Sequence, residues 1–399
     1  MRLNPEEHRP WWYGDALGVG ASGLELDGHP LTAIAAEHGT PTYVYGLDSV
    51  RRRIRELRAA LGAVGAPGRI HYAVKANRCR ALLEVIREEG LGIDACSPRE
   101  VALALEVGFT PEQISVTAGM LSNRDLEAFA RAHVHLNLDT RSALRRWSEI
   151  AGPAERGVGI RLDPGVRVGW GEHFAYGVSK FGFPIEQALE IVELARSLGL
   201  EVDTLHVHAG WGLKAEDEAR LAHVFEQIAE LSAHISSLHT INVGGGLGGR
   251  LRGEEQPLSL ERWAALLRGS LGATGLGIAC EPGTYIAASA GVLIAEVNTV
   301  ELRRSVKWYG LDVGSAVNVY AAYYGLPLEI LSLRDPLCTA GEPAHVAGNI
   351  NEPNDVFARA RPLPRFREGE LVGIYPAGAY GASMASDHCM RGAPAEVAL

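Results

Sequence analysis

Between residues 42 and 290, short apolar segments alternate with amphipathic ones, and this repeat constrains the fold more than any other feature of the chain. The amphipathic segments have helical spacing, because Val50, Ile54, Leu57 and Leu61 fall on one face of a helix. The apolar segments are typical of buried parallel strands. In order they are IHYAV at 70, LGIDA at 91, ISVT at 114, VHLNL at 134, GVGIRL at 157, VDTLHVH at 202, TINV at 240 and GLGIAC at 275. Eight such strands, each followed by a helix or a long loop, predict a (β/α)8 barrel in preference to an open doubly wound sheet.

The two ends of the chain have a different pattern. Residues 291–399 contain segments such as VLIAEVNTVELR and GELVGIY, which are bounded by Gly, Pro and Asn and indicate strands. The first 41 residues also resemble strands and turns. We therefore expect an N-terminal segment of a β domain at 1–41, a barrel at 42–290 and the rest of the β domain at 291–399. The two flanks would pair into one discontinuous domain, since chain termini often lie close together.

Charge and composition exclude some classes of protein. Lys and Arg number 38 against 48 Asp and Glu, and a net charge of −10 argues against binding to a phosphate backbone. The N-terminus lacks the apolar core of a signal peptide, and no apolar run is long enough to span a bilayer. Five cysteines without a CxxC pair indicate a reducing compartment and no structural zinc. We expect a cytoplasmic protein that binds neither nucleic acid nor membrane.

Several polar residues fall at predicted strand ends, where barrels place their active sites. Lys75 follows the first strand, and a desolvated lysine can form a Schiff base with a carbonyl, although a lysine at the rim can also simply extend into solvent. His206 and His208 project from one face of the sixth strand, a spacing that equally suits metal ligation. Glu281 ends the eighth strand, where an ion-pair role is the simpler alternative.

A run of glycines follows the seventh strand, from Gly244 to Gly246 and again at Gly248 and Gly249. It satisfies the pattern GxGxxG, but no helix follows and no acidic residue lies about 20 residues further on, so it fails as a dinucleotide fingerprint. Barrels commonly bind phosphate in the loops after strands 7 and 8, and glycines let backbone N–H groups approach the anion. We interpret the run as a phosphate loop; a tight turn alone would explain fewer glycines.

A Schiff-base lysine, an imidazole, a phosphate loop and a carboxylate on one rim together suggest pyridoxal 5′-phosphate. The phosphate would lie on the glycines and the aldehyde would react with Lys75. Glu281 would pair with the pyridine nitrogen and keep it protonated, so that the ring can accept electrons when a bond at Cα breaks.

The chain resembles the alanine-racemase-fold pyridoxal phosphate decarboxylases, most closely the diaminopimelate decarboxylase branch, over nearly its whole length. The resemblance rests on GTPTYVYG, HYAVKAN, GLGIDACSPREVALAL, HLNLD, LHVHAGW, INVGGG, CEPG, GNINEPND and AGAYGASMAS, which occur in the family's order. It implies a barrel with a C-terminal β domain, an aldimine on Lys75, a quinonoid intermediate and a homodimer with shared active sites.

The resemblance also implies individual roles. Catalytic roles fall to Lys75, His208, Glu281, Asn351 and Glu352, with His208 stacked on the cofactor ring. The other cofactor-binding residues are Gly244, Gly245, Gly246, Gly283, Thr284 and Tyr380. The substrate-binding residues are Tyr320, Tyr324, Tyr380, Asn351 and Glu352. By the same analogy His206 is a packed strand residue, Asp94 and Arg161 support the rim, and no metal is bound.

Three departures from the family pattern concern arginines and phosphate partners. Thr284 stands where the family has an arginine after Glu-Pro-Gly, and Trp211 stands where it has a serine. The segment from Val319 to Tyr324 lacks the arginine that binds the far carboxylate of diaminopimelate. Losing such a clamp costs about 2–5 kcal/mol by analogy with a broken buried charge pair. We therefore expect the substrate to be an amino acid other than diaminopimelate, within a pathway to a specialised metabolite.

A fourth departure is Asn351, which replaces the family cysteine that protonates the intermediate from the partner subunit. Asparagine has no acidic proton near neutral pH, so protonation must come from elsewhere or the reaction differs. Decarboxylation is the favoured reaction. The alternatives are diaminopimelate decarboxylation itself, racemisation, retro-aldol cleavage and decarboxylation-dependent transamination. A metal-dependent barrel hydrolase and a non-catalytic cofactor-binding protein are further hypotheses.

Overall fold

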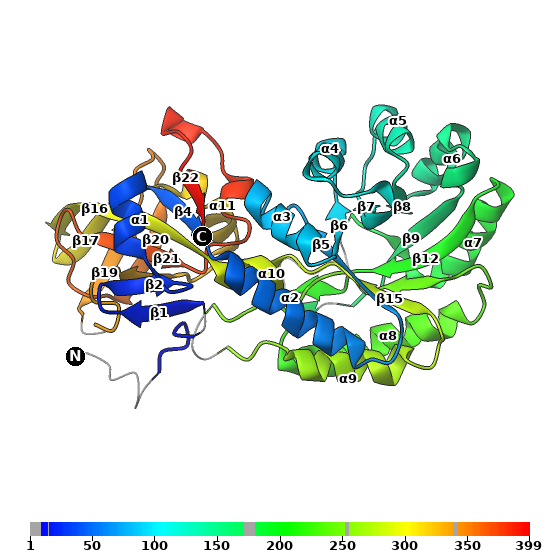
Figure 1. The fold of residues 1–399 in the computed structure, drawn as a ribbon, viewed down its shortest axis with the longest axis horizontal. Coiled ribbons are helices and arrows are strands. Elements are labelled where there is room, and N and C mark those ends of the chain that lie inside the picture. Colours follow the sequence, from blue (N-terminus) through cyan, green and yellow to red (C-terminus); the bar gives the residue numbers. More distant parts are fainter. Residues whose placement is uncertain (1–8, 15, 167, 171–179, 252–254, 339–340) are drawn as a thin grey trace.

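The computed structural model describes residues 9–14, 16–166, 168–170, 180–251, 255–338 and 341–399. Figure 1 shows a barrel with helices on its outside, beside a β-rich part that contains both the first and the last strands of the chain. Among the described residues no helix is both long and apolar enough to cross a membrane.

Eight parallel strands of the described chain form the barrel. They are β5 (Gly68–Ala73), β6 (Gly92–Ala95), β7 (Ile114–Thr117), β8 (His135–Leu138), β9 (Gly157–Asp163), β12 (Glu201–Val207), β14 (Thr240–Asn242) and β15 (Gly277–Cys280). Pairing of β8 with β9 and of β15 with β5 closes the ring. Each predicted apolar segment overlaps one of these strands, in the same order, so the predicted barrel is confirmed.

Amphipathic helices cover the outside of the barrel. They are α2 (Leu47–Gly62), α3 (Arg80–Glu88), α4 (Pro98–Val107), α5 (Asn123–Ala132), α6 (Arg141–Ile150), α7 (Ala188–Ser197), α8 (Glu218–Ser232) and α9 (Leu260–Leu271). In α2 the predicted face of Val50, Ile54, Leu57 and Leu61 is buried against the barrel core. Each such side chain contributes about 1.5–3 kcal/mol relative to an exposed one. This burial holds the strands, and hence their carboxyl ends, in fixed positions.

The β-rich part is built around the long strand β16. Its sheet contains β4 (Thr42–Tyr45), β16 (Gly291–Arg303), β17 (Val306–Leu311), β18 (Glu329–Ser332), β19 (Pro343–Ala347), β20 (Val356–Pro362), β21 (Leu371–Tyr375) and β22 (Ala395–Ala398). Strand β4 pairs antiparallel with β16 and parallel with β22. Strand β4 therefore lies in one sheet with the C-terminal strands, although its residues fall in the range 42–290 that we predicted for the barrel. The boundaries 1–41, 42–290 and 291–399 stay a prediction.

A small N-terminal sheet packs on this β-rich sheet. It contains β1 (Leu17–Gly20), β2 (Gly23–Leu26) and β3 (His29–Pro30), followed by helix α1 (Leu31–His38). Leu24, Leu26 and Leu31 pack with Val292 and Ile294 in one apolar core. Helix α1 differs from the prediction of strands and turns in this region. It begins after Pro30 without a side-chain cap, and it buries only Leu31 and Ala35. Its sequence therefore has neither a capping residue nor a long apolar face from which a helix could be predicted.

Several short elements follow the longer strands. They are β10 (Val168–Gly169), β11 (Phe183–Pro184), β13 (Gly210–Trp211), α10 (Thr284–Ala287) and α11 (Val319–Tyr324). The buried Tyr43 hydroxyl donates a 2.6 Å hydrogen bond to the carbonyl of Val317, just before α11. Gly325, at φ 64°, ends α11 in a left-handed conformation that glycine adopts without strain. These contacts fix α11, which carries Tyr320 and Tyr324.

Candidate active site

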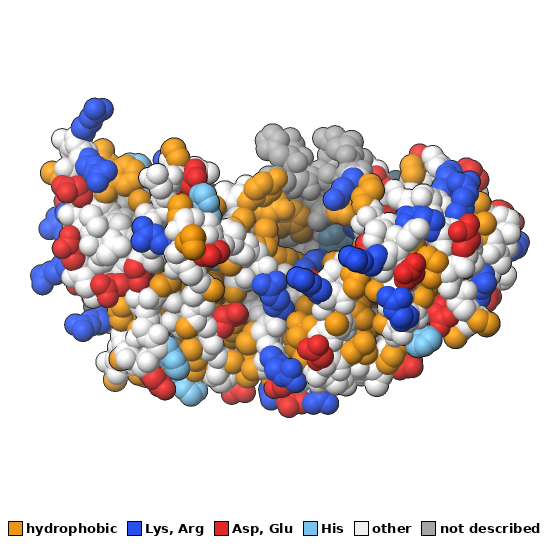
Figure 2. Space-filling view, turned by 90° about the horizontal axis from the view of Figure 1, so that it is seen from above, with side chains coloured by type: hydrophobic (Ala, Val, Ile, Leu, Met, Phe, Trp, Pro, Cys, Tyr) orange, Lys and Arg blue, Asp and Glu red, His pale blue; other side chains and the backbone are white. Residues whose placement is uncertain are grey.

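Most of the predicted site residues line one cavity at the carboxyl ends of the barrel strands. The cavity has a volume of about 490 Å³. Its lining includes Lys75, His208, Gly245, Gly246, Glu281, Gly283, Thr284, Tyr320, Tyr324 and Tyr380. Figure 2 shows the molecule hollowed between its two parts, with hydrophobic side chains along one wall of the hollow.

Lys75 follows β5 and projects into this cavity. Its Nζ lies 2.6 Å from Oδ2 of Asp94, which is fully buried on β6, and 3.4 Å from Sγ of Cys96. Burial alone would lower the pKa of Lys75, but the Asp94 carboxylate, with smaller effects of Cys96, Tyr380 and Glu281, raises it well above the ordinary value. The free lysine is therefore an ammonium held by a carboxylate.

Glu281 follows β15 and is held by three polar side chains. Its Oε1 accepts hydrogen bonds from the Thr117 hydroxyl at 3.0 Å and from Nδ2 of Asn242 at 2.8 Å, and its Oε2 lies 2.9 Å from Nε2 of His206. Burial would raise the pKa of Glu281, but His206, with Lys75 and His208, lowers it well below the ordinary value. The structure thus keeps a charged carboxylate in a buried position.

His208 is a neutral imidazole with a fixed orientation. The backbone N–H of Gly245 donates a 3.0 Å hydrogen bond to its Nδ1, so that nitrogen carries no proton. Burial, together with the nearby positive charges of Arg161 and Lys75, lowers the pKa of His208 to about 3. An uncharged ring in this position can pack flat against an aromatic ligand.

The glycines after β14 and β15 keep the cavity open. A Cβ on Gly245 would lie 2.5 Å from the carbonyl oxygen of Glu281, and a Cβ on Gly283 would lie 2.8 Å from Cβ of Ala76. Gly246 has φ 102°, and its N–H makes no hydrogen bond with any residue that the structure describes. Larger residues would therefore clash or strain the backbone here.

Aromatic side chains close the cavity from the β-rich part. The ring centroids of Tyr320 and Tyr380 are 4.8 Å apart, and those of Trp211 and Tyr324 are 5.2 Å apart. The Tyr380 N–H donates a 2.7 Å hydrogen bond to the carbonyl of Ala76, which ties the C-terminal tail to the segment that holds Lys75.

Three predicted residues do not line this cavity of their own chain. Gly244 is one of them, and its N–H donates a 2.9 Å hydrogen bond to Oδ1 of Asn242. The other two lie in the C-terminal third of the chain. Asn351 and Glu352 are exposed in the connection between β19 and β20, and Oε1 of Glu352 lies 2.8 Å from Nε2 of His388. Neither residue lines the cavity of its own chain. Their predicted roles stay a prediction that depends on a partner subunit.

Sequence reasoning missed several residues of the site. Thr117 and Asn242 hold Glu281, and Cys96 and Phe181 line the cavity. Thr117, Asn242 and Cys96 fall at or just after predicted strand ends, so the rule that found Lys75 could have found them. Their side chains are neutral, whereas the prediction considered only charged groups and imidazoles at those positions. His206, predicted to be only a packed residue, contacts Glu281 directly.

The residues present suit pyridoxal phosphate. A lysine amine faces a cavity that also contains a charged carboxylate and a neutral imidazole. The Gly246 N–H is unpaired among the described residues. A Cβ added to Gly245 would lie 3.5 Å from Cε1 of His208, so the glycine leaves space beside the imidazole. Oδ1 of Asp94 is buried without a hydrogen-bond partner in the described chain, so the site has a polar group left to satisfy.

Comparison with known proteins agrees with this geometry. Residues 47–288 match the pyridoxal binding domain of the pyridoxal-dependent decarboxylases. The chain belongs to this family and is a pyridoxal phosphate-dependent decarboxylase, with the alanine-racemase-type fold that the sequence predicted.

Individual relatives are similar over nearly the whole chain. Diaminopimelate decarboxylase of Methanothermobacter thermautotrophicus is 36% identical over 94% of this chain and 90% of its own. The enzyme of the same name from Deinococcus radiodurans is 32% identical over 94% of each chain. The crystal structure of Helicobacter pylori diaminopimelate decarboxylase complexed with L-lysine has a TM-score of 0.84 and 25% identity, covering 92% of this chain and 94% of that one.

These relatives contradict one prediction. We expected a substrate other than diaminopimelate, because the arginines at two family positions are missing, and that expectation is wrong. The prediction assumed that a dicarboxylic substrate needs arginines at those two positions. A carboxylate can be bound by any cation that reaches it, and the structure places other cations, Arg161 among them, at or next to the cavity.

Proposed function

We propose that this enzyme decarboxylates diaminopimelate, releasing one carboxylate as CO2 and leaving lysine. The observation that carries the proposal is the 36% identity, over 94% of this chain, to a diaminopimelate decarboxylase. The cavity at the strand ends, with Lys75 and a charged Glu281 on one rim, is consistent with it.

The residues that would hold the cofactor follow from their chemistry. The Lys75 amine suits the aldehyde, Glu281 the ring nitrogen and His208 the face of the ring. Gly246, Gly283, Thr284 and Tyr380 lie on the same lining and suit the phosphate. When bound, pyridoxal phosphate supplies an electron sink for the pair released from the broken bond at Cα.

A proton must replace CO2 at Cα. Asn351 has no acidic proton near neutral pH. Nζ of Lys75 holds a proton 2.6 Å from the Asp94 carboxylate, inside the cavity. We therefore assign Lys75 as the proton source.

The proposal also covers the oligomeric state and the cellular compartment of the enzyme. We place the enzyme in a homodimer, because Asn351 and Glu352 are exposed and lie away from the cavity of their own chain, where only a partner's site could use them. We place it in the cytoplasm, because all five cysteines are free, as a reducing compartment keeps them.

The test is a substrate panel with the purified holoenzyme. Diaminopimelate, lysine, ornithine and 2-aminoadipate are compared by CO2 release at equal concentrations. The proposal expects diaminopimelate to react with the highest kcat/KM. A higher kcat/KM for any of the other three would contradict it.

A further inference from the structure

The last part of the chain before β22 reaches back to the turn that carries Lys75. We call residues 376–386 the tail and residues 74–76 the lysine turn. Strand β5 ends at Ala73, so Lys75 lies just outside the hydrogen-bonded ladder of the barrel strands. The position of its side chain therefore depends on how the lysine turn is held.

The barrel holds the main chain of the lysine turn through N–H groups. The N–H of Val74 donates a 3.1 Å hydrogen bond to the carbonyl of Asp94. The N–H of Ala76 donates a 3.0 Å bond to the carbonyl of Ala73. The carbonyl groups of Lys75 and Ala76 have no partner in the barrel among the residues that the structure describes. Their partners come from the tail.

Hydrogen bonds from the tail satisfy both of these carbonyl groups. The Ser383 hydroxyl donates a 2.8 Å hydrogen bond to the carbonyl of Lys75, and the carbonyl of Ala76 is a second acceptor at 3.1 Å. The Tyr380 N–H donates a 2.7 Å bond to the same Ala76 carbonyl. Within the described part of the chain, the Ser383 hydroxyl is the one partner of the Lys75 carbonyl. A single side chain of the tail thus holds the main chain of Lys75 on this side.

Close contacts fix the path of the tail. A Cβ on Gly378 would lie 2.0 Å from the carbonyl oxygen of Ala287, and a Cβ on Gly381 would lie 2.6 Å from the hydroxyl of Tyr43. The buried Asn77, next to the lysine turn, donates a 2.9 Å hydrogen bond from Nδ2 to the carbonyl of Gly378. The tail is therefore a rigid support, against which the lysine turn can be held.

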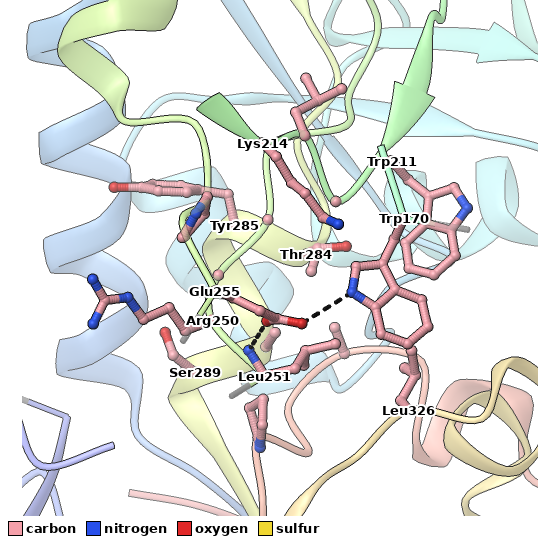
Figure 3. A pocket seen from close by; sticks show the side chains of 18 of the residues that line it. Trp170, Trp211, Lys214, Arg250, Leu251, Glu255, Thr284, Tyr285, Ser289 and Leu326 are labelled. Carbon is pink, nitrogen blue, oxygen red and sulfur yellow. Dashed lines mark hydrogen bonds between the residues drawn. The ribbon is translucent and has the colours of Figure 1, made fainter. Parts of the chain in front are cut away.

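The tail also lines two cavities. Tyr380 and Met384 line the candidate active site. Pro376 and Ala379 line an adjoining cavity of about 500 Å³, which Figure 3 shows from close by. On these sides the tail faces open space, so its position there depends more on its hydrogen bonds to the lysine turn.

The proposed function requires the Lys75 amine to perform two tasks. It holds the cofactor, and it supplies the proton that replaces CO2, so the side chain must move between them. A lysine amine is attached through a flexible four-carbon chain. Misplacing a reacting group by about 1 Å can cost about 10²-fold in rate. The main chain of Lys75 must therefore stay in place while its side chain moves.

We propose that Ser383 is a positioning residue, whose hydroxyl holds the Lys75 carbonyl and so returns the amine to one place in the cavity in each turnover. Ser383 does not itself line the cavity, and it acts through Lys75. This inference rests on the part of the proposed function that concerns Lys75, and it does not depend on which amino acid reacts.

The first test compares variants of the holoenzyme by steady-state kinetics on its best substrate. Ser383→Ala should lower kcat about ten-fold with little change in KM, because Lys75 acts in the chemical steps. Ser383→Thr keeps a hydroxyl and should retain most of the activity. Ser386→Ala is the matched control in the same tail, since that hydroxyl lies 3.5 Å from the carbonyl of Ala316, and it should leave kcat unchanged. An unchanged kcat in Ser383→Ala, or an equal loss in Ser383→Thr, would overturn the inference.

The second test measures the Lys75 amine itself, in the full-length protein freed of cofactor. Acetic anhydride labels neutral amines, and mass spectrometry measures the labelling of Lys75. The Asp94 carboxylate raises the pKa of Lys75, so an amine held beside it is protonated near neutral pH. Without the Ser383 hydroxyl the amine moves away from Asp94 and its pKa falls, so labelling of Ser383→Ala at neutral pH should be about ten-fold faster. Equal rates in Ser383→Ala and Ser386→Ala would overturn the inference.

The labelling also separates this inference from the proposed function. Absence of CO2 release from diaminopimelate, with faster labelling in Ser383→Ala, would reject the proposed function and keep the role of Ser383. Release of CO2 from diaminopimelate, with equal labelling, would reject the role of Ser383 alone. Circular dichroism checks that each variant is folded. If Ser383→Ala does not fold, Ser383→Cys takes its place, because a thiol is similar in size and only a weak donor.

Discussion

His206 Nε2 lies 2.9 Å from Oε2 of Glu281, and both side chains are buried at the carboxyl end of the barrel. A buried carboxylate would ordinarily become neutral. His206 is the partner that contributes most to keeping Glu281 charged, while Thr117 and Asn242 hold the other oxygen. We therefore propose that His206 is a positioning residue, which would act through Glu281.

Replacing His206 should make activity sensitive to acid. In His206→Phe, burial raises the pKa of Glu281 without the opposing effect of the imidazole. Glu281 then takes up a proton as the pH falls, and kcat should fall about ten-fold per pH unit below the new pKa. The measurement is the pH profile of kcat. His206→Gln, which can still donate a hydrogen bond, should show a smaller shift. If kcat falls at the same acidic pH in the wild type and in His206→Phe, His206 does not keep Glu281 charged.

Replacing Asp94 should change how fast the cofactor binds covalently. The aldehyde reacts only with a neutral amine, and Asp94 is the main group that raises the pKa of Lys75. In Asp94→Asn that pKa falls, so Lys75 is neutral at lower pH, and reconstitution with pyridoxal phosphate at neutral pH should be about ten-fold faster. The rate is followed by the visible absorbance of the bound cofactor. Glu37→Gln, an exposed carboxylate on α1, serves as the control. A rate in Asp94→Asn no faster than in the control would contradict the prediction.

The Tyr43 hydroxyl should contribute to the stability of the β-rich part. Tyr43→Phe removes its buried hydrogen bond to the Val317 carbonyl, and should lower the free energy of unfolding by about 1–2 kcal/mol. Urea unfolding measures the change. Tyr323→Phe, at a tyrosine that is 68% exposed, should have almost no effect. Equal midpoints for the two variants would show that the bond contributes nothing.

A shared active site in a homodimer can be tested by mixing two inactive variants. Lys75→Ala removes the amine that holds the cofactor, and Glu352→Ala removes a group that we assign to the partner's site. Each variant alone should be nearly inactive. Dimers formed from both should regain activity, because one of their two sites contains both native residues. No recovery in mixed dimers would reject the sharing of sites.

The barrel was predictable from the sequence because each of its strands is a short apolar run followed by a separate amphipathic segment. The same reasoning missed β22 (Ala395–Ala398), whose pairing with β4 depends on a contact between the two ends of the chain and leaves no local pattern. Helix α1 was missed because it buries only two side chains. The spacing of apolar residues along the chain therefore predicted only those helices and strands that bury a whole face in the core.

The site was predictable where a charged group or an imidazole follows a strand, as with Lys75, His208 and Glu281. Neutral partners such as Asn242 give no such signal, because asparagine occurs in many solvent-exposed turns. A cavity of about 500 Å³ next to the candidate active site could not be predicted, since Lys214 and Tyr320, which both line it, come from the barrel and from the β-rich part. The substrate prediction was wrong for the same reason. It rested on the missing arginines at two motif positions, and the sequence does not show which other cations the fold brings to the active site.

The central claim is that this enzyme converts diaminopimelate to lysine at Lys75. The most direct measurement is the appearance of lysine by NMR, together with CO2, when the holoenzyme is given diaminopimelate, with Lys75→Ala as the control. We expect equal amounts of lysine and CO2 from the wild type and neither from Lys75→Ala. Production of lysine by Lys75→Ala, or a wild type that leaves diaminopimelate intact while it decarboxylates another amino acid, would contradict it.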